Sequence, residues 1–207
     1  MKNQIRVALF LAASLMASAS TIYTPTCVTD NPGDCNALLP QFELTAVNNG
    51  TSVAFNLLNE ATGLQSVIAA IYFDSPNTFT GISSFTGSTG VSFQVGGSPA
   101  NPPSANGFTT DFYLTATPPP PHNGLGLGDS ITINLGVAPS GNVDAALQNT
   151  QIAIHVISFE NKSETLVFAP AGLVGNHNEG QAPEPATLGL VGSALVGVGL
   201  ITKRRKK

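Results

Sequence analysis

The chain has 207 residues, with eight Lys and Arg against twelve Asp and Glu, a formal net charge of −4. Seven of the eight basic residues lie at the two ends, so the stretch from Ser20 to Glu184 holds one lysine and all twelve acidic residues, a charge of −11. Phosphate recognition depends on Lys and Arg, which argues against nucleic acid and anionic lipid as partners. Cations, neutral glycans and basic partners stay open, as does an acidic surface that only keeps the protein soluble.

The N-terminal residues 1–19 have the pattern of a secretory signal peptide. Lys2 and Arg6 form a positive start, residues 7–16 are apolar, and Ala17 and Ala19 give the small-x-small pattern of a cleavage site. An apolar segment of about ten residues is short for a permanent membrane anchor. We therefore expect cleavage after Ala19 and a mature chain that begins near Ser20.

Cys27 and Cys35 are the only two cysteines of the chain. An exported chain in an oxidising compartment is expected to join them in a disulfide, and the turn-rich residues 30–34 between them favour a close approach. The alternative is a calcium loop, because Asp30, Asn31 and Asp34 supply hard oxygen ligands. Their spacing does not fit the calcium-loop pattern D-x-[DN]-x-[DN]-G, so no metal site is expected here.

Residues 20–180 are expected to form a single acidic, all-β domain of the β-sandwich or jelly-roll-like class. Apolar and polar residues alternate over 42–46 and 53–57, and Asn49-Gly50 between them is a tight-turn signal, which predicts a hairpin. Further strands are expected from the same pattern, which makes about nine in all, at 66–73, 78–84, 91–95, 110–116, 130–137, 151–159 and 164–168. The segments 66–73 and 151–159 are apolar on both faces and should be central strands. One short helix is expected at 143–148, capped by Asn142.

Two proline-rich segments interrupt the strand pattern. Residues 96–107 contain three prolines, and residues 118–121 are four consecutive prolines. Proline stiffens the backbone and cannot donate to a sheet ladder, so both segments should be connections or edges. They are either a rigid rim that presents a partner-binding face or ordinary loops at the end of the sandwich.

No sequence motif indicates catalysis. The chain lacks H-E-x-x-H, G-x-S-x-G and a second cysteine pair, and the glycines at 124, 126 and 128 miss the G-x-G-x-x-G pattern. His155 lies in an apolar strand, on the same side as Ala153 and Ile157, and is expected to pack there, while His122 and His177 lie in loops. A metal site that joins these histidines to Asp74 or Asp129 has no support from the spacing. We expect a protein that is not an enzyme and holds no cofactor or metal.

Glycoside hydrolysis needs a pair of carboxylates at a defined separation. The sequence does not show which acidic side chains converge, so this chemistry stays open. The candidates come from several predicted strands and loops: Glu43, Glu60, Asp74, Asp111, Asp129, Glu160 and Glu164.

The C-terminal residues 183–207 have three parts, which are Pro183-Glu184-Pro185, an uncharged apolar run at 188–201, and five basic residues: Lys203, Arg204, Arg205, Lys206 and Lys207. As a helix the run spans roughly 21 Å, against about 30 Å of hydrocarbon. Ala186 and Thr187 can enter the helix at one end, and the basic side chains at the other end can snorkel to the headgroups, which predicts a single transmembrane helix at about 187–202. The basic tail 203–207 would stop transfer and stay in the cytoplasm, with all residues before Pro183 on the far side.

In these parts and their order, the tail resembles the PEP-CTERM protein-sorting domain of exported bacterial proteins. The resemblance covers about an eighth of the chain. It implies that an exosortase, a membrane-embedded transpeptidase-like enzyme, reads Pro183, Glu184 and Pro185 and processes the tail near them during export. These three residues are then recognised by another enzyme and are not catalytic.

The sequence predicts a non-enzymatic exported protein, in the inner membrane as a precursor and then at the cell surface or in the extracellular matrix. Its expected partners are an exosortase, the membrane before processing, and exopolysaccharide or biofilm matrix, but not nucleic acid. The alternative is a carbohydrate-binding module of the same fold, or less readily a hydrolytic one, in which Phe79 and Phe108 stack on glycans instead of packing in the core. A third interpretation keeps the intact tail as a permanent inner-membrane anchor.

Overall fold

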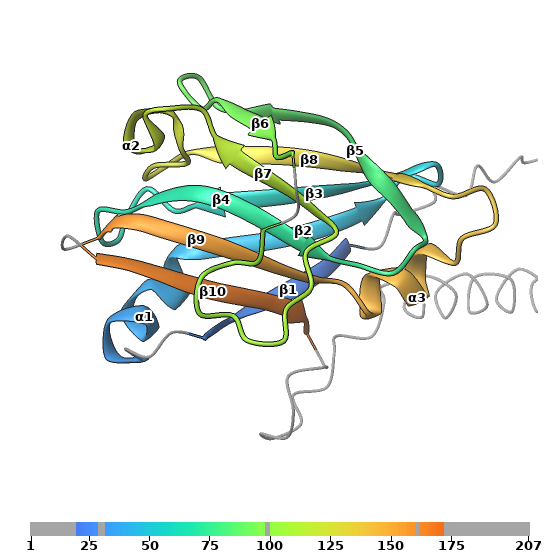
Figure 1. Cartoon of the computed structure of the whole chain (residues 1–207), viewed down its shortest axis with the longest axis horizontal. Helices are drawn as coiled ribbons and strands as arrows, with labels where there is room; N and C mark the ends of the chain where they lie inside the picture. The colour runs from blue at the N-terminus through green and yellow to red at the C-terminus, as the bar shows by residue number, and fades with distance from the viewer. Residues whose placement is uncertain (1–19, 29–31, 98–99, 160–161, 172–207) are drawn as a thin grey trace, which may run out of the picture. The chain divides into compact units, whose positions relative to one another are not determined.

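The computed structural model describes residues 20–28, 32–97, 100–159 and 162–171. These residues form an antiparallel β structure with a few short helices (Figure 1). The strands are β1 (Ser20–Cys27), β2 (Phe42–Asn48), β3 (Ser52–Asn59), β4 (Val67–Asp74), β5 (Phe79–Gly87), β6 (Phe93–Val95), β7 (Phe112–Ala116), β8 (Ser130–Val137), β9 (Gln151–Phe159) and β10 (Lys162–Pro170). The helices are α1 (Pro32–Leu38), the 3-10 helix η1 (Leu39–Gln41), α2 (Pro120–Asn123) and α3 (Val143–Gln148).

The strands form one ten-stranded sheet in the order β5-β8-β3-β2-β1-β10-β9-β4-β7-β6. The sheet folds over, so that its two halves face each other across the core. Phe55 of β3 meets Phe73 of β4 there, with ring centroids 5.4 Å apart. Phe79 of β5 and Tyr23 of β1 also contact Phe55, at 6.3 Å and 5.9 Å. The predicted all-β, sandwich-like class is confirmed.

Period-two alternation places one face of each strand in this core. In the hairpin of β2 and β3, Leu44 pairs with Leu57 and both are buried, while polar residues at neighbouring positions face outward. The connection turns at Gly50, which has a φ of +85° that glycine adopts without steric cost. Its N–H donates to Oδ1 of Asn48 at 2.8 Å. The hairpin is therefore formed at the predicted place.

Both ends of the core are covered by helices. Asn142 caps α3 as predicted, because its Oδ1 accepts the N–H of Ala145 at 3.1 Å. The buried side chains of α3 are Val143, Ala146 and Leu147. At the other end, α1 contributes Cys35 and Leu38, both 0% exposed. This helix was expected as a turn, because Pro32 and Gly33 are turn residues, yet proline is also favoured in the first helical turn.

The described residues form ten strands where about nine were expected, and the additional strand is β1, which the sequence did not indicate. It contains Pro25, which weakens the strand signal. Pairing with β2 covers only Ser20–Tyr23, so at Pro25 the strand has β10 alone as a neighbour, on one side. Proline has no backbone N–H, and its absence is tolerated at Pro25 because no described strand pairs on the other side. The proline run at 118–121, expected as a loop, partly forms α2.

Candidate functional site

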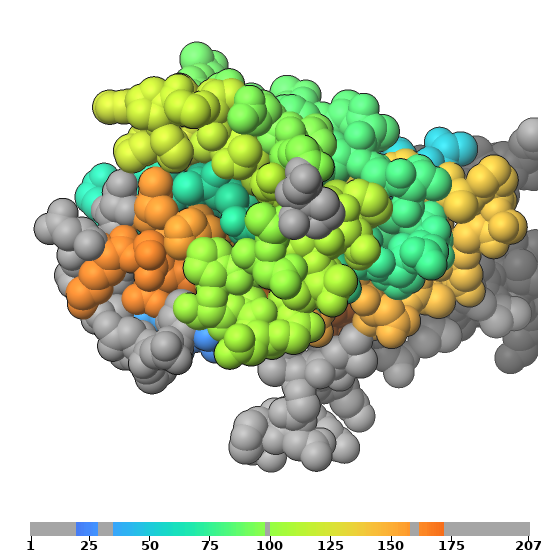
Figure 2. Space-filling model, in the orientation of Figure 1, coloured from blue at the N-terminus to red at the C-terminus, as the bar shows by residue number. Residues whose placement is uncertain are grey.

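Residues 100–110, called the covering loop below, cross the outer face of the half-sheet that contains β10, β9 and β4. Figure 1 shows this yellow-green segment passing in front of those strands. Ala105 and Phe108 of the covering loop join a second apolar cluster with four strand residues: Ala70, Tyr72, Ala153 and Val167. The space-filling view shows the loop lying over this face (Figure 2). The extra layer explains why β4 and β9 are apolar on both faces, as expected of central strands.

Two carboxylates fix the C-terminal end of the covering loop. Oδ2 of Asp74 accepts the N–H of Thr109 at 3.1 Å, and Oδ2 of Asp111 accepts the N–H of Ser75 at 2.8 Å. Thr110 adds a hydroxyl hydrogen bond of 3.0 Å to the carbonyl of Ala100. The loop is thus tied to the end of β4 by hydrogen bonds as well as to its face by apolar packing.

The covering loop contains a strained residue. Ser104 has a φ of +62°, and it is the one residue other than glycine with a positive φ in the described part of the chain. Its carbonyl accepts the N–H of Asn106 at 3.1 Å, and Gly107 follows with a φ of +85°. A side chain in this left-handed region costs roughly 1 kcal/mol or more, and such strain tends to persist at functional sites.

A pocket of about 500 Å³ lies beside the covering loop, above the ends of β1, β9 and β10. Its polar side chains are Thr26, Ser104, Asn106 and Gln151. Its apolar side chains are Val28, Ala105, Phe108 and Val167. No lining side chain carries a charge. The pocket thus offers amide and hydroxyl groups next to an apolar wall.

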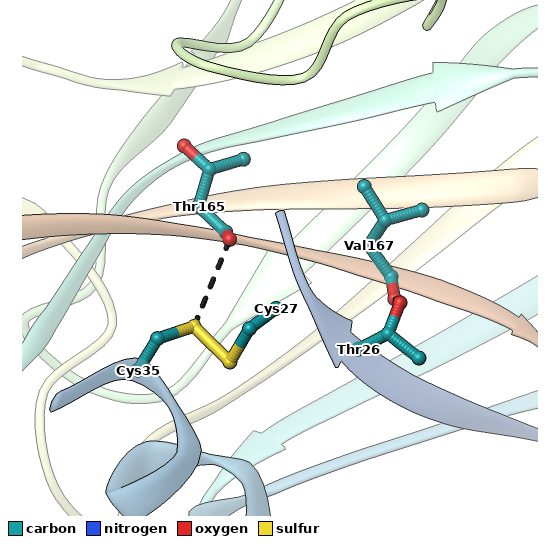
Figure 3. The surroundings of a disulfide bond; sticks show 5 residues. All are labelled: Thr26, Cys27, Cys35, Thr165 and Val167. Atoms are coloured by element: carbon teal, nitrogen blue, oxygen red, sulfur yellow. Dashed lines mark hydrogen bonds between the residues drawn. A yellow bond between two sulfur atoms is a disulfide. The ribbon is translucent and has the colours of Figure 1, made fainter. Parts of the chain in front are cut away.

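A disulfide between Cys27 and Cys35 holds the end of β1 that contributes to this pocket (Figure 3). The two Cα atoms are 5.9 Å apart. Sγ of Cys35 lies 3.9 Å from the carbonyl oxygen of Thr165, a sulfur–oxygen contact, since a disulfide sulfur has no proton to donate. Val28, just beyond Cys27, donates its N–H to the same carbonyl at 3.3 Å. The disulfide therefore fixes the strand segment on which two pocket residues lie.

Two titratable side chains lie in the neighbouring strands but not in the pocket. Burial lowers the pKa of His155 on β9, and a hydrogen bond with the Glu164 backbone partly opposes this. Nδ1 of His155 has no hydrogen-bond partner among the described residues. Glu164 of β10 shares the inward side with Leu166 and is 3% exposed. Its Oε2 likewise has no partner in the described part of the chain. His155 is packed in a strand, as expected.

The two phenylalanines considered for glycan stacking are not available to a ligand. Phe79 is 3% exposed and Phe108 is 5% exposed. Phe79 packs against Phe55 in the main core, and Phe108 packs in the second cluster. The interpretation that both are core residues holds. Phe108 borders the pocket, but its ring does not present an open face.

The candidate carboxylates are spread over the molecule. Asp74 and Asp111 are brought to neighbouring positions by the pairing of β4 with β7, and both bind loop N–H groups. Asp129 accepts the N–H of Gly126 at 3.0 Å in the glycine-rich turn. Glu43 and Glu60 line two separate shallow hollows elsewhere. Within the described ranges, no group of three His, Cys, Asp or Glu side chains could hold a metal ion.

Several predicted residues lie outside the described part of the chain. They are Asp30, Asn31, Glu160, His177, the signal-peptide residues Ala17 and Ala19, the motif Pro183-Glu184-Pro185, the expected transmembrane helix 187–202, and the basic residues 203–207. Among the helices that the structure describes, none has the length and apolar character needed to cross a bilayer.

Comparison with known families decides the nature of the C-terminal tail. Residues 181–206 match the family model of the PEP-CTERM protein-sorting motif. This chain carries a PEP-CTERM sorting motif. The matched range includes Pro183, Glu184 and Pro185. The match supports an exported protein that is sorted by an exosortase from a membrane-anchored precursor. No curated protein and no solved structure matches the chain.

The pocket was not expected from the sequence. From the prolines of residues 96–107, the sequence allowed two interpretations of this segment. It was either a rigid rim that presents a partner-binding face or an ordinary loop at the end of the sandwich. The covering loop instead lies on the sheet face. Its pocket partners come from β1, β9 and β10, and no local pattern links these strands.

Proposed function

We propose that this protein is a non-enzymatic component of the bacterial cell surface or extracellular matrix, sorted by an exosortase and associated with exopolysaccharide. The observation that carries the proposal is the PEP-CTERM motif at residues 181–206, preceded in the chain by a β-sandwich-like domain. The motif supplies the export route. The role of the domain is proposed from its surface.

The outer face of β3, β8 and β5 supports association with a hydroxyl-rich polymer. Its hydroxyl and amide side chains bond to one another across strands: Thr132 donates to Oδ1 of Asn56 at 2.8 Å, and Asn134 donates to the Ser84 hydroxyl at 3.1 Å. Thr132 and Asn56 also line a shallow hollow of about 370 Å³. Uncharged groups of this kind can exchange their hydrogen bonds for bonds to neutral sugar hydroxyls.

The use of the carboxylates supports a structural role. Asp74, Asp111 and Asp129 each accept a backbone N–H in a loop or turn. A carboxylate that holds a loop in this way stabilises the fold, and its replacement should lower stability. This use agrees with a protein whose acidic residues shape and solubilise the domain.

The sorting step is tested by replacing Pro183, Glu184 and Pro185 together with alanine. Cells that express either form are separated into membrane, surface and matrix fractions, and the mature C-terminus is read by mass spectrometry. We expect the wild-type surface form to lack residues 203–207 and the variant to remain in the membrane with Lys207. A surface form of the wild type that still ends at Lys207 would contradict processing.

The matrix role is tested by sedimentation. Exopolysaccharide purified from the producing cells is mixed with the exported protein and pelleted, and bovine serum albumin serves as an acidic control protein. We expect the exported protein to be enriched in the pellet while albumin stays in the supernatant, with no new reducing sugar ends released. Release of reducing ends would point to the hydrolytic alternative, and equal distribution of both proteins would count against matrix association.

A further inference from the structure

The open pocket beside the covering loop is used neither by the sorting motif nor by the surface proposed for the matrix role. We propose that it binds a neutral saccharide unit, of one or two sugar rings. This inference rests on the proposed function, because the saccharide would come from the exopolysaccharide with which the protein is proposed to associate. The volume of the pocket, about 500 Å³, lies within the range of small-molecule sites, roughly 300–1,000 Å³.

The charge of the pocket selects a neutral ligand. None of the lining side chains is charged, and the described residues contain a single Lys or Arg side chain, that of Lys162 in β10. An anionic sugar would find no cation in the lining to offset the loss of its hydration, and a cationic ligand would find no carboxylate there. A neutral ligand loses only hydrogen bonds with water, which the lining can replace.

The polar groups match sugar hydroxyls. The amides of Asn106 and Gln151 each offer two donors and one acceptor oxygen, and both side chains are exposed at the pocket. The Thr26 hydroxyl donates its proton to the carbonyl of Val167 at 3.1 Å, which leaves its oxygen free to accept. A sugar hydroxyl both donates and accepts, so it can satisfy either kind of group.

The apolar wall suits the C–H face of a pyranose ring. Val28 just after β1, Val167 of β10 and Ala105 of the covering loop provide this wall. Val167 and Ala105 are largely buried, at 9% and 8% exposed, so the wall is held in place by the second apolar cluster. A ligand would therefore bind to a preformed surface, which lowers the entropic cost of binding.

The strain at Ser104 is the further observation that favours a ligand. A glycine would adopt the φ of +62° at no steric cost, yet the position carries a hydroxyl side chain that lines the pocket. A side chain kept in an unfavourable backbone conformation points to a role other than folding. Contact between the serine hydroxyl and the ligand would supply that role.

The binding test uses the full chain, purified in detergent with its disulfide intact. The probes are cellobiose, laminaribiose, mannobiose and chitobiose as neutral sugars and digalacturonate as the acidic one, titrated by calorimetry and by saturation-transfer NMR. We expect at least one neutral disaccharide to bind and digalacturonate not to bind. Failure of all four neutral probes, or equal binding of digalacturonate, would overturn the proposal.

Variants place the binding in the pocket. Asn106→Ala and Gln151→Ala should each weaken binding about tenfold, the effect of one or two lost hydrogen bonds. The matched control Gln94→Ala removes an exposed amide from β6 at a position that does not line the pocket, and it should leave the affinity unchanged. An unchanged affinity in both pocket variants, or loss of binding in the control, would contradict this location.

Ser104→Gly separates a ligand role from a folding role. Relief of the left-handed strain offsets the greater freedom of glycine in the unfolded chain, so the thermal midpoint should not fall. Binding should weaken several-fold, because the hydroxyl is lost. A lower midpoint with unchanged affinity would show that Ser104 serves only the fold.

The outcomes also separate this proposal from the proposed function. A wild-type protein that reaches the matrix and sediments with exopolysaccharide but binds no neutral disaccharide keeps the matrix role and loses the pocket. A protein that binds a disaccharide through Asn106 and Gln151 but stays out of the matrix keeps the pocket and loses the matrix role.

Discussion

The hydroxyl of Tyr23 donates a 3.0 Å hydrogen bond to the carbonyl of Leu147, across 124 residues of sequence. Tyr23 lies in β1 at 2% exposed, and Leu147 lies in the last turn of α3. Burial raises the pKa of Tyr23 well above its ordinary value, so the hydroxyl remains a donor at all physiological pH. The bond joins the first strand of the described domain to the helix that covers one end of the core.

Tyr23→Phe should destabilise the domain modestly. The ring keeps its packing on Phe55, and only the buried hydrogen bond is lost, which costs about 1 kcal/mol. The thermal midpoint, followed by circular dichroism, should fall by about 2–4 °C. Tyr113→Phe removes a hydroxyl from a half-buried ring and is the control, with a smaller expected change. Equal shifts in both variants would show that the bond contributes nothing specific.

Gln41→Leu should be more damaging. The amide of Gln41, which is 3% exposed, donates to Oδ1 of Asn59 at 2.8 Å and accepts the N–H of Leu64 at 2.9 Å. Leucine leaves the buried Oδ1 of Asn59 and the half-buried N–H of Leu64 without this partner, at about 1–3 kcal/mol each. We expect a loss of about 2–4 kcal/mol in the free energy of unfolding, measured in urea. Gln148→Leu, at an exposed position of α3, should change the free energy little, and a comparable loss there would refute the network.

Local patterns in the sequence predicted local structure. The hairpin of β2 and β3 needs only alternation and the Asn49-Gly50 turn, and α3 needs only Asn142 and a short apolar face. Strand β1 was not predicted, because its pairing with β10 joins residues 139 to 147 positions apart and its proline obscures the local signal. The register between distant strands depends on the packing of the whole core, so a local sequence pattern does not show which strands pair.

The contrast between local patterns and distant contacts also applies to the sorting motif and the pocket. The PEP-CTERM motif is contiguous, so the order of its three parts was enough to recognise it. The pocket draws Thr26, Asn106 and Gln151 from three separate parts of the chain. Only the folded sheet brings them together. The sequence suggested a surface role for the proline-rich segment but could not show which strands it covers.

His155 should make stability depend on pH. Burial lowers its pKa from the ordinary value of 6.5, so the folded domain favours the neutral imidazole. As pH falls through 6.5, the unfolded chain takes up a proton that the folded domain does not, and the free energy of unfolding decreases until pH reaches the lowered folded pKa. Urea unfolding between pH 7.5 and 5.5 measures this slope.

His155→Gln should flatten the slope in this pH range, because the titrating group is gone. His122→Gln, in the short helix α2, is the matched control and should keep the wild-type slope. A slope that persists in His155→Gln would assign the pH dependence to other groups.

The disulfide should stabilise the domain mainly through β1. Replacing Cys27 and Cys35 together with serine frees a short loop in the unfolded chain, which costs roughly 2–3 kcal/mol in the chain-entropy estimate. The effect should be local in hydrogen exchange. The N–H of Val28, which bonds to Thr165, should exchange faster, while the N–H groups of the β3–β8 ladder lose protection only as far as global stability falls.

The same double variant should also weaken sugar binding in the pocket, because Thr26 and Val28 flank Cys27. Comparing it with Gln41→Leu, which lowers stability by a similar amount at a site outside the pocket, separates the two causes. Under conditions where both variants remain folded, only the cysteine variant should bind the disaccharide more weakly. Equal weakening in both would mean that the affinity follows global stability and that the disulfide has no specific effect on the pocket.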